Sequence, residues 1–414
     1  MTALFKNRES CRVCKSTDFE SILNFGELAL TGVFLEDGNQ VLKAPLHLVR
    51  CLSCGLVQLE QTYSLDELYT DSYGYESHLN SSMRTHLQSK AILLQKKYLS
   101  GKPNPVIVDI ASNDGTLLAG YSLPDATLIG IDPLIGRVSD HYPWAAIKAP
   151  EFFSSKAFYS VSQVRAALVT SLSVIYDLDD PVEFASEVAK ILEEDGVWHF
   201  EQSYLPTMVE TLSYDTICHE HLLYLRLTDI VTILEKVGLQ VKEASLNSIN
   251  GGSIAVTAVK SKSIVTPDPF VIYLLNREKQ DGYLSGVRLA EFASDATKHS
   301  IDLKNLVTQY KEKNFRILGL GASTKGNVLL QWCGLDSSII HSIGDINPKK
   351  FGKRTPGSDI EIVDEKVVLD SADNKVLALV MPWHFRDGIV RNSSEFVANG
   401  GKLLFPLPKI EIVC

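Results

Sequence analysis

The sequence predicts an α/β protein in which two units of alternating strands and helices follow a small metal-stabilised module. Two short apolar runs, residues 106–110 and 316–320, each lead into a turn and then a helix start, as in nucleotide-binding α/β folds. Two cysteine pairs near the start of the chain supply the third observation. Because 414 residues are too many for one core, two to three domains are expected.

The composition is that of a globular chain with an acidic balance. Hydrophobic residues make up 45% of the sequence, and the formal net charge is -10. No apolar run approaches the roughly 20 residues of a membrane span, and the first residues lack a signal-peptide core. We therefore expect a cytoplasmic protein, a monomer or small homo-oligomer, with no membrane partner. The acidic balance also argues against a general nucleic-acid surface.

The first unit, residues 1–70, contains two Cys-x-x-Cys pairs, with strands predicted at 47–50 and 56–59. Four thiolates at this spacing match a tetrahedral zinc site. Four protein ligands leave no open position, so a structural role is expected. Disulfide pairing is the alternative, which a cytoplasmic compartment and the close spacing within each pair disfavour. The predicted ligands are Cys11, Cys14, Cys51 and Cys54.

The second unit, residues 71–305, opens with a helix predicted over about 81–99 and the strand 106–110. This strand runs into an acidic turn at 112–115, and a helix start is expected from Thr116. A strand, a tight turn and a helix start present backbone N–H groups to a ligand. Carboxylates in the turn repel a pyrophosphate but attract a cation. An ordinary Asx turn after a core strand is the alternative.

S-adenosylmethionine fits this acidic turn because it carries a sulfonium and an ammonium. The next strand, 128–131, ends in Asp132, roughly 20 residues on, where an acid can accept both ribose hydroxyls. The ammonium is expected at Asp109 or Asp114. The predicted cofactor contacts are Asp109, Ala111, Ser112, Asn113, Asp114, Gly115, Asp132, Pro133 and Ser171.

The alternation continues with strands at 166–170 and 197–200, which predicts a parallel sheet. Asp180 directly before Pro181 caps a helix whose apolar residues recur to Leu192. A helix over 228–237 and closing strands at 239–243 and 254–259 follow. A charged helical stretch over roughly 268–313 follows and is long enough to bridge domains.

The densest cluster of proton-transferring side chains, 213–224, follows the strand that ends near Gln202. His219 and His221 flank Glu220, but this is not the i, i+4 spacing that places two histidines on one helical face, so a metal is disfavoured. Surface polar residues on a loop are the plain alternative. An imidazole with a pKa of about 6.5 is a natural general base at neutral pH.

The third unit, residues 306–414, repeats the strand and glycine turn, but with a lysine in place of the acids. Gly321 and Lys325 at a helix start suit a phosphate or diphosphate, although a lone glycine motif is a weak signal. We predict a smaller Rossmann-like domain here. Other side chains expected at the same edge are Asn327, Asp345, Lys349 and His384.

Together these motifs resemble those of the S-adenosylmethionine-dependent C-methyltransferases of nucleotide-linked 4-keto deoxysugars. The shared features are the four-cysteine module, Ser-Asn-Asp-Gly, His-Glu-His, Gly-Ala-x-x-Lys-Gly-Asn and Thr-Pro-Gly, which span nearly the whole chain. The resemblance implies a class I, Rossmann-like methyltransferase core between a zinc module and a Rossmann-like nucleotide-sugar domain. It also implies methyl transfer to a ring carbon, commonly C-3, next to the keto group.

The resemblance further implies a role for individual side chains. His221 is expected to remove the ring proton, with Glu220 as a supporting acid or substrate contact. Tyr75, or Tyr73 in a shifted register, is expected to donate to the enolate oxygen. Several family members have a tyrosine where this chain has Cys218, so the role of that tyrosine is lost or moves to Tyr224. The substrate contacts expected besides Tyr73 are Gln202, Tyr224, Asn250, Gly321, Lys325, Asn327, Asp345, Lys349 and His384.

Two alternatives stay open at the level of the sequence. One is a zinc-containing RNA methyltransferase, because zinc knuckles also serve RNA recognition, although the acidic balance and the lysine-bearing turn count against it. The other is a non-catalytic protein that only binds S-adenosylmethionine. Such a protein would bind the cofactor tightly without turnover.

Overall fold

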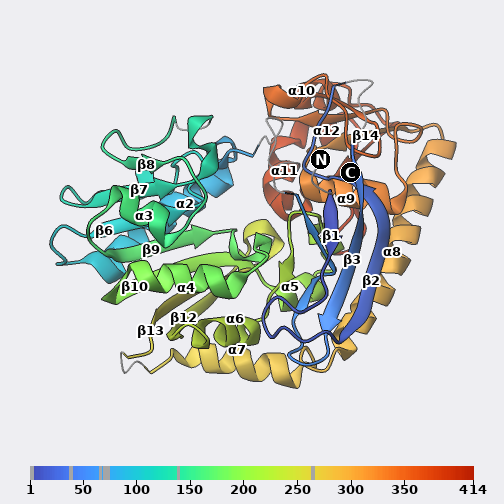
Figure 1. Ribbon diagram of the computed structural model, residues 1–414. Helices are drawn as coiled ribbons and strands as arrows, with labels where there is room; N and C mark the ends of the chain where they lie inside the picture. Colours follow the sequence, from blue (N-terminus) through green and yellow to red (C-terminus); the bar gives the residue numbers. More distant parts are fainter. Residues whose placement is uncertain (1–3, 37–40, 65–67, 69–74, 138–139, 263–265) are drawn as a thin grey trace.

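The computed structural model describes residues 4–36, 41–64, 68, 75–137, 140–262 and 266–414 (Figure 1). Within these residues a seven-stranded and a six-stranded sheet form two α/β units, and a four-stranded sheet belongs mainly to the N-terminal module. Figure 1 shows the N-terminal strands beside the seven-stranded sheet and below the C-terminal part of the chain. The predicted fold class is therefore confirmed.

The N-terminal module is built from antiparallel strands. Strand β1 (Phe5–Asn7) pairs with β5 (Gln61–Tyr63). The larger sheet has the order β11-β4-β3-β2, with β2 (Phe19–Ala29), β3 (Lys43–Cys51) and β4 (Val57–Leu59). Its remaining strand, β11 (Leu223–Tyr224), comes from the second unit and directly follows the His-Glu-His segment. The module is thus joined to the rest of the chain by main-chain pairing.

The second unit is a sheet of order β12-β13-β10-β9-β6-β7-β8. The five strands from β10 to β8 are parallel, whereas β12 and β13 are antiparallel additions. The strand order reverses between β6 and β9, which is where α/β sheets hold ligands. The strands are β6 (Val106–Ile110), β7 (Thr127–Ile131), β8 (Ile147–Ala149), β9 (Ala166–Leu172), β10 (Leu192–Ser203), β12 (Leu239–Asn247) and β13 (Ser253–Lys260).

Most helices of this unit lie where the sequence predicts them. A π-helical turn (Gln95–Leu99) extends the first helix as far as predicted, and Asp180 caps α4 by accepting from the Glu183 N–H at 3.0 Å. The helices are α2 (Ser81–Leu94), α3 (Ser155–Val161), α4 (Pro181–Ile191), α5 (Leu205–Glu210) and α6 (Leu227–Glu235).

The helix expected from Thr116 is wrong, because only a 3-10 turn forms at Leu118–Gly120. Helix α2 packs so closely here that a Cβ on Gly120 would come within 2.7 Å of the Ala91 Cβ. Helix α2 thus occupies the position beside the sheet that a longer helix would need.

The charged stretch predicted over 268–313 forms two helices, α7 (Pro269–Gln280) and α8 (Val287–Glu312). They are separated by a turn in which Gly282 and Gly286 have a positive φ. Figure 1 shows α8 running along the N-terminal strands toward the last unit. None of the helices in the described residues is long and apolar enough to cross a membrane.

The last unit is a sheet of order β16-β15-β14-β17-β18-β19, parallel except for β19. Its strands are β14 (Arg316–Leu320), β15 (Ser342–Asp345), β16 (Glu361–Asp364), β17 (Val376–Val380), β18 (Lys402–Phe405) and β19 (Glu411–Val413). Its helices are α9 (Thr324–Cys333), α10 (Glu365–Leu369), α11 (Arg386–Asn392) and α12 (Ser394–Ala398).

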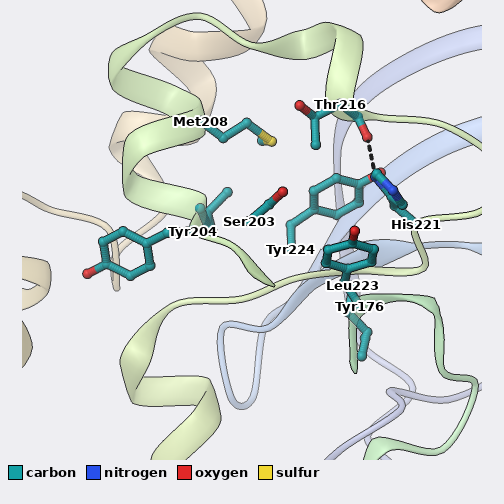
Figure 2. A pocket seen from close by; sticks show the side chains of 9 residues that line it. Tyr176, Ser203, Tyr204, Met208, Thr216, His221, Leu223 and Tyr224 are labelled. Carbon is teal, nitrogen blue, oxygen red and sulfur yellow. Dashed lines mark hydrogen bonds between the residues drawn. The ribbon is translucent and has the colours of Figure 1, made fainter. Parts of the chain in front are cut away.

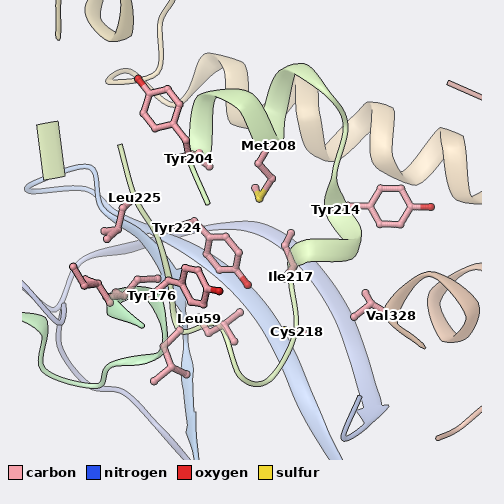
Figure 3. Packing of buried hydrophobic residues seen from close by; sticks show 14 of the residues in the cluster. Leu59, Tyr176, Tyr204, Met208, Tyr214, Ile217, Cys218, Tyr224, Leu225 and Val328 are labelled. Carbon is pink, nitrogen blue, oxygen red and sulfur yellow. The ribbon is translucent and has the colours of Figure 1, made fainter. Parts of the chain in front are cut away.

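One apolar cluster connects all three parts of the chain. Figure 3 shows Leu59 from the N-terminal module, Tyr176 and Tyr224 from the second unit, and Val328 from α9 in this cluster. Each of these side chains is buried. The edges of the two large sheets are therefore held in a common core and do not depend on a flexible linker for their positions.

Candidate active site

The four cysteines of the N-terminal module converge as predicted. Their sulfur atoms all lie within 4.8 Å of one another, with Sγ–Sγ distances of 3.7 Å for Cys11 and Cys54 and 3.5 Å for Cys14 and Cys51. A tetrahedron of sulfurs around zinc has edges of about 3.8 Å, whereas a disulfide requires about 2.05 Å. The donor set fits a structural zinc ion and excludes the disulfide alternative.

The turn after β6 has an unusual backbone. Ala111, Asn113 and Gly115 have φ angles of 55°, 48° and 85°, and only glycine adopts this conformation without strain. Asp132 at the end of β7 holds the turn, because its carboxylate accepts from the Asn113 N–H at 2.9 Å and from the Leu134 N–H at 2.7 Å. Strain kept at alternate residues is typical of a ligand-binding turn.

The acids of this turn have different surroundings. Asp114 accepts from the Thr116 N–H at 3.1 Å, the Thr116 hydroxyl at 2.7 Å and the His78 N–H at 2.8 Å, so it closes the turn. Asp109 lies buried below and accepts from the Thr170 hydroxyl at 2.7 Å. Desolvation raises the pKa of Asp109 to about 7, and the charges of Asp132 and Asp114 add to this effect. A bound cation would relieve this excess of negative charge.

Residues 75–79, called the cover segment, lie against the same turn. The Asn113 amide donates to the Tyr75 carbonyl at 3.1 Å and accepts from the Ser77 N–H at 3.0 Å. Glu76 forms an ion pair with Lys349 of the last unit. Tyr75 is 48% exposed as a residue, but burial of its hydroxyl raises the pKa of the phenol, and a hydrogen bond with the Ser77 side chain opposes this shift. Tyr73 lies outside the described residues.

Three other predicted cofactor contacts surround the turn. The Ser112 hydroxyl is 2.5 Å from the Tyr142 hydroxyl, and Pro133 is exposed at the rim. Ser171 is fully buried and accepts from the Trp198 indole N–H at 3.0 Å. The Ser171 side chain is therefore committed to the core, which leaves its main chain as the part able to face a ligand.

His221 lies with Tyr176 and Tyr224 at the wall of a small pocket, as Figure 2 shows. Its Nδ1 lies 2.8 Å from the Thr216 carbonyl oxygen. Because a carbonyl only accepts, Nδ1 carries the proton and Nε2 keeps a free lone pair. Burial lowers the pKa of His221 to about 3, and the positive charge of Lys325 contributes. The Tyr176 ring centroid lies 4.3 Å from that of His221.

Two carboxyl groups next to this pocket each have one buried oxygen without a partner in the described part of the chain. Glu220 Oε1 and Asp177 Oδ1 are buried and have no hydrogen-bond partner among the described residues. Desolvation raises the pKa of Glu220 to about 7. It raises the pKa of Asp177 well above its usual range, and the charge of Glu220 adds to the shift. Sequence reasoning missed Asp177, although its place shortly after the end of β9, at the ligand-binding edge, was an available signal.

Other residues of the His-Glu-His region have separate roles. His219 lies 3.2 Å from the Ala44 carbonyl oxygen and packs edge-on against the Tyr63 ring, so it attaches this segment to the N-terminal module. Cys218 is fully buried, and burial raises the pKa of its thiol well above the usual range. The buried Tyr224 hydroxyl has no partner within the described part of the chain, which keeps it available as a donor.

Gln202 at the exit of β10 is another unsatisfied group. It is 1% exposed, and neither its amide oxygen nor its amide nitrogen has a partner in the described residues. An unpaired buried amide is costly, so such a group is typically completed by an ordered water or a ligand. The neighbouring Glu201 differs, because it is paired with His86 and Lys90 at 2.7 Å each.

The edge of the last sheet meets this region. The Lys325 ammonium donates to the Asn250 carbonyl at 2.7 Å, and desolvation lowers its pKa. The Trp383 indole donates to Asp215 at 2.8 Å. Burial lowers the pKa of the adjacent His384 to about 3, and Lys325 contributes. The exits of the two sheets thus face the same space.

The remaining predicted substrate contacts are already bound to protein groups. Asn327 is fully buried and donates to the Thr31 carbonyl at 2.7 Å, although its Oδ1 has no partner in the described residues. Asp345 accepts from the Ala322 N–H at 2.8 Å and thereby holds the glycine turn. Gly321, with φ 82°, packs so closely on Pro382 that a Cβ would lie 2.5 Å from its ring. These groups shape the edge and are not exposed side-chain donors.

Family models match consecutive parts of the chain. The model described as a zinc binding domain matches residues 11–69, and the methyltransferase domain matches residues 83–244. The model described as the C-methyltransferase C-terminal domain matches residues 248–408. A full-length relative, the C-methyltransferase NovU of Streptomyces niveus, is 28% identical over 98% of this chain and 97% of its own length.

The chain is an S-adenosylmethionine-dependent C-methyltransferase. The four cysteines of this methyltransferase fit a zinc ion.

Solved structures resemble only part of this methyltransferase. The mitomycin 7-O-methyltransferase MmcR is 17% identical, with a TM-score of 0.32, over 44% of this chain and 54% of that chain. The N-methyltransferase NodS of Bradyrhizobium japonicum, in complex with S-adenosyl-L-homocysteine, is 17% identical, with a TM-score of 0.33, over 44% of this chain and 88% of that chain.

Proposed function

We propose that this methyltransferase transfers the methyl group of S-adenosylmethionine to a ring carbon, C-3, of a nucleotide-linked 4-keto deoxysugar, with His221 as the base. The observation that carries the proposal is the hydrogen bond from His221 Nδ1 to the Thr216 carbonyl, which leaves a neutral imidazole with a free Nε2. A ring carbon becomes a nucleophile only after it loses a proton, and a neighbouring ketone makes that loss possible by forming an enolate.

The low pKa of His221 suits a base that works only on a bound substrate. In the free pocket, burial lowers the pKa to about 3, so the imidazole is unprotonated at neutral pH. As the proton leaves the ring carbon, the enolate gains negative charge close to the imidazolium. This pairing stabilises both charges in a pocket with little water and raises the proton affinity of His221 during the step.

The developing enolate oxygen requires a hydrogen-bond donor. Tyr75 lies beside the cofactor turn, and the buried Tyr224 hydroxyl next to His221 has no partner in the described residues. Glu220, with a pKa of about 7, is half protonated at pH 7 and supplies a third donor. A phenol or a carboxylic acid in this position compensates for Cys218, because a buried thiol is a weak donor.

The last unit, residues 306–414, supplies the nucleotide-binding edge in this proposal. Lys325 reaches the Asn250 carbonyl and places its positive charge toward His221 and His384. A diphosphate at this turn would bind next to the helix start of α9 and close to Lys325. Gln202 and Asn250 from the second unit would contact the sugar. The methyl donor approaches from the acidic turn and the acceptor from the opposite edge.

Solvent exchange tests the proposed base separately from methyl transfer. With S-adenosylhomocysteine bound, a 4-keto deoxysugar nucleotide in D₂O is expected to gain deuterium at the reacting ring carbon. His221→Asn should lose this exchange and slow methyl transfer by about 10²-fold or more, while still binding S-adenosylhomocysteine. His47→Asn, in the N-terminal module, is the matched control and should retain both activities. Full activity in His221→Asn would refute the assignment.

A further inference from the structure

The N-terminal module contacts two of the segments that line the His221 pocket. The first, residues 173–180, here called the β9 loop, contains Tyr176 and Asp177. The second, residues 219–226, here called the His segment, contains Glu220 and His221. The Tyr176 and His221 rings meet at 4.3 Å although the segments are about 40 residues apart in the chain. Contacts from another part of the chain must therefore hold the β9 loop and the His segment side by side.

Arg12 is the side chain that reaches the β9 loop. It lies between the zinc ligands Cys11 and Cys14 and is fully buried. Its Nε is 3.3 Å from the Asp179 carboxylate, which also accepts from Arg8 at 3.0 Å and from the Thr62 hydroxyl at 2.5 Å. The turn formed by residues 11–14, here called the Cys11 knuckle, therefore fixes the end of the β9 loop.

A second contact from the same knuckle strengthens this attachment. Lys15 lies 3.1 Å from Asp180, and Asp180 caps helix α4. The β9 loop is thus anchored to the module immediately before the helix that follows it.

The same arginine also reaches the strand that holds the His segment. The Arg12 main-chain N–H and its guanidinium donate to Gln58 Oε1 at 3.2 Å and 3.1 Å. Gln58 lies in β4, opposite Leu223 of β11. The Leu59 N–H donates to the Leu222 carbonyl at 2.9 Å, one residue after His221. Arg12 therefore lies between two attachments, one to each side of the pocket.

We propose that Arg12 is a positioning residue that sets the placement of Tyr176 relative to His221. Through Arg12, the metal-binding turn of residues 11–14 affects the rate of methyl transfer. The proposal rests on the proposed role of His221 as the base. A zinc ion bound to Cys11 and Cys14 would restrain the backbone on both sides of Arg12. Without the guanidinium, Gln58 and Asp179 lose a shared buried partner, and the two segments are free to shift relative to each other.

Hydrogen exchange measured by mass spectrometry tests this coupling without relying on activity. In Arg12→Gln with S-adenosylhomocysteine bound, deuterium uptake is expected to rise about threefold or more in residues 173–180 and 219–226. Zinc content should stay at wild-type level and S-adenosylhomocysteine affinity should change less than about twofold, because the turn after β6 is not touched. Lys6→Gln is the matched control, since Lys6 is exposed and lies 3.9 Å from Asp179.

The kinetic result expected for Arg12→Gln is a fall in kcat of about 10- to 100-fold with little change in KM for S-adenosylmethionine, as for a misplaced reacting group. Arg12→Lys should recover part of the loss, because it keeps the charge opposite Asp179 but not all the guanidinium hydrogen bonds to Gln58 and to the Leu59 and Gln61 carbonyls. A change in exchange confined to residues 5–63, with both pocket segments unchanged, would overturn the proposal.

Asp179→Asn decides the matter if Arg12→Gln does not fold. It removes the charge on the other side of the contact and leaves the module intact. Greater exchange in residues 173–180 supports the positioning role, and wild-type exchange there overturns it. Because exchange needs only S-adenosylhomocysteine, this outcome is independent of whether the wild-type enzyme methylates a 4-keto sugar, which tests the proposed function.

Discussion

Glu220→Gln is expected to remove a loss of activity that the wild-type enzyme shows as pH rises above about 7. Burial raises the pKa of Glu220 to about 7, and its Oε1 has no protein partner in the described residues. The carboxyl is therefore protonated below pH 7 and ionised above it. If Glu220 serves as a hydrogen-bond donor to the substrate, only the protonated form is productive, and kcat/KM falls as pH rises.

The size of the effect follows from this pKa. About half of the Glu220 carboxyls are protonated at pH 7 and about one tenth at pH 8, so kcat/KM falls about fivefold between these values. His221 adds no change above pH 5, because its pKa of about 3 keeps the imidazole neutral. Glutamine still donates a hydrogen bond but cannot ionise. The variant should give a flat profile from pH 6 to 9, at a plateau about tenfold lower.

The assay is the initial rate of S-adenosylhomocysteine formation at a sugar nucleotide concentration well below KM, from pH 6 to 9. Glu9→Gln, at an exposed position of the N-terminal module, is the matched control and should keep the wild-type profile. A wild-type rate that is constant or rises between pH 7 and 8 would contradict the role of Glu220 as a donor. So would a Glu220→Gln variant that still loses activity over the same range.

Three further predictions concern other unsatisfied or charged groups. Gln202→Leu should leave the melting temperature unchanged or raise it, because the variant removes an unpaired buried amide. The KM for the sugar nucleotide should increase about tenfold, and an unchanged KM would place Gln202 outside the site. Asp109→Asn should make the free protein more stable at pH 8 by a few kcal/mol and by clearly less at pH 5, because a pKa raised to about 7 means that the buried carboxyl costs progressively more stability as pH rises from about 4 to 7; urea unfolding at both pH values checks the sign. Cys51→Ser should lose zinc and lower the melting temperature, and a metal-free variant of wild-type stability would contradict a structural site.

Local chemistry made much of the architecture predictable. The two cysteine pairs, the cap at Asp180 and the acidic turn after β6 each depend on residues close together in the chain, so spacing alone indicates their structure. The prediction of a helix after that turn was wrong, because α2 packs against Gly120 and fills the space that this helix would need. Helix α2 comes from an earlier part of the chain. A pattern over neighbouring residues contains no information about such a competitor.

The sequence by itself determined which types of group the protein brings to its site: four thiolates, an acidic turn, a histidine segment and a lysine-bearing turn. Only the tertiary structure decided which of these groups are free to react. Asp114 and Asp345 are occupied by protein partners, whereas Asp177, Gln202 and Glu220 hold polar atoms that are unpaired in the described residues. Whether a polar group is available to a ligand depends on its burial and on hydrogen bonds from segments that are distant in the chain. Packing between distant segments also brings the centroids of the Tyr176 and His221 rings to within 4.3 Å of each other.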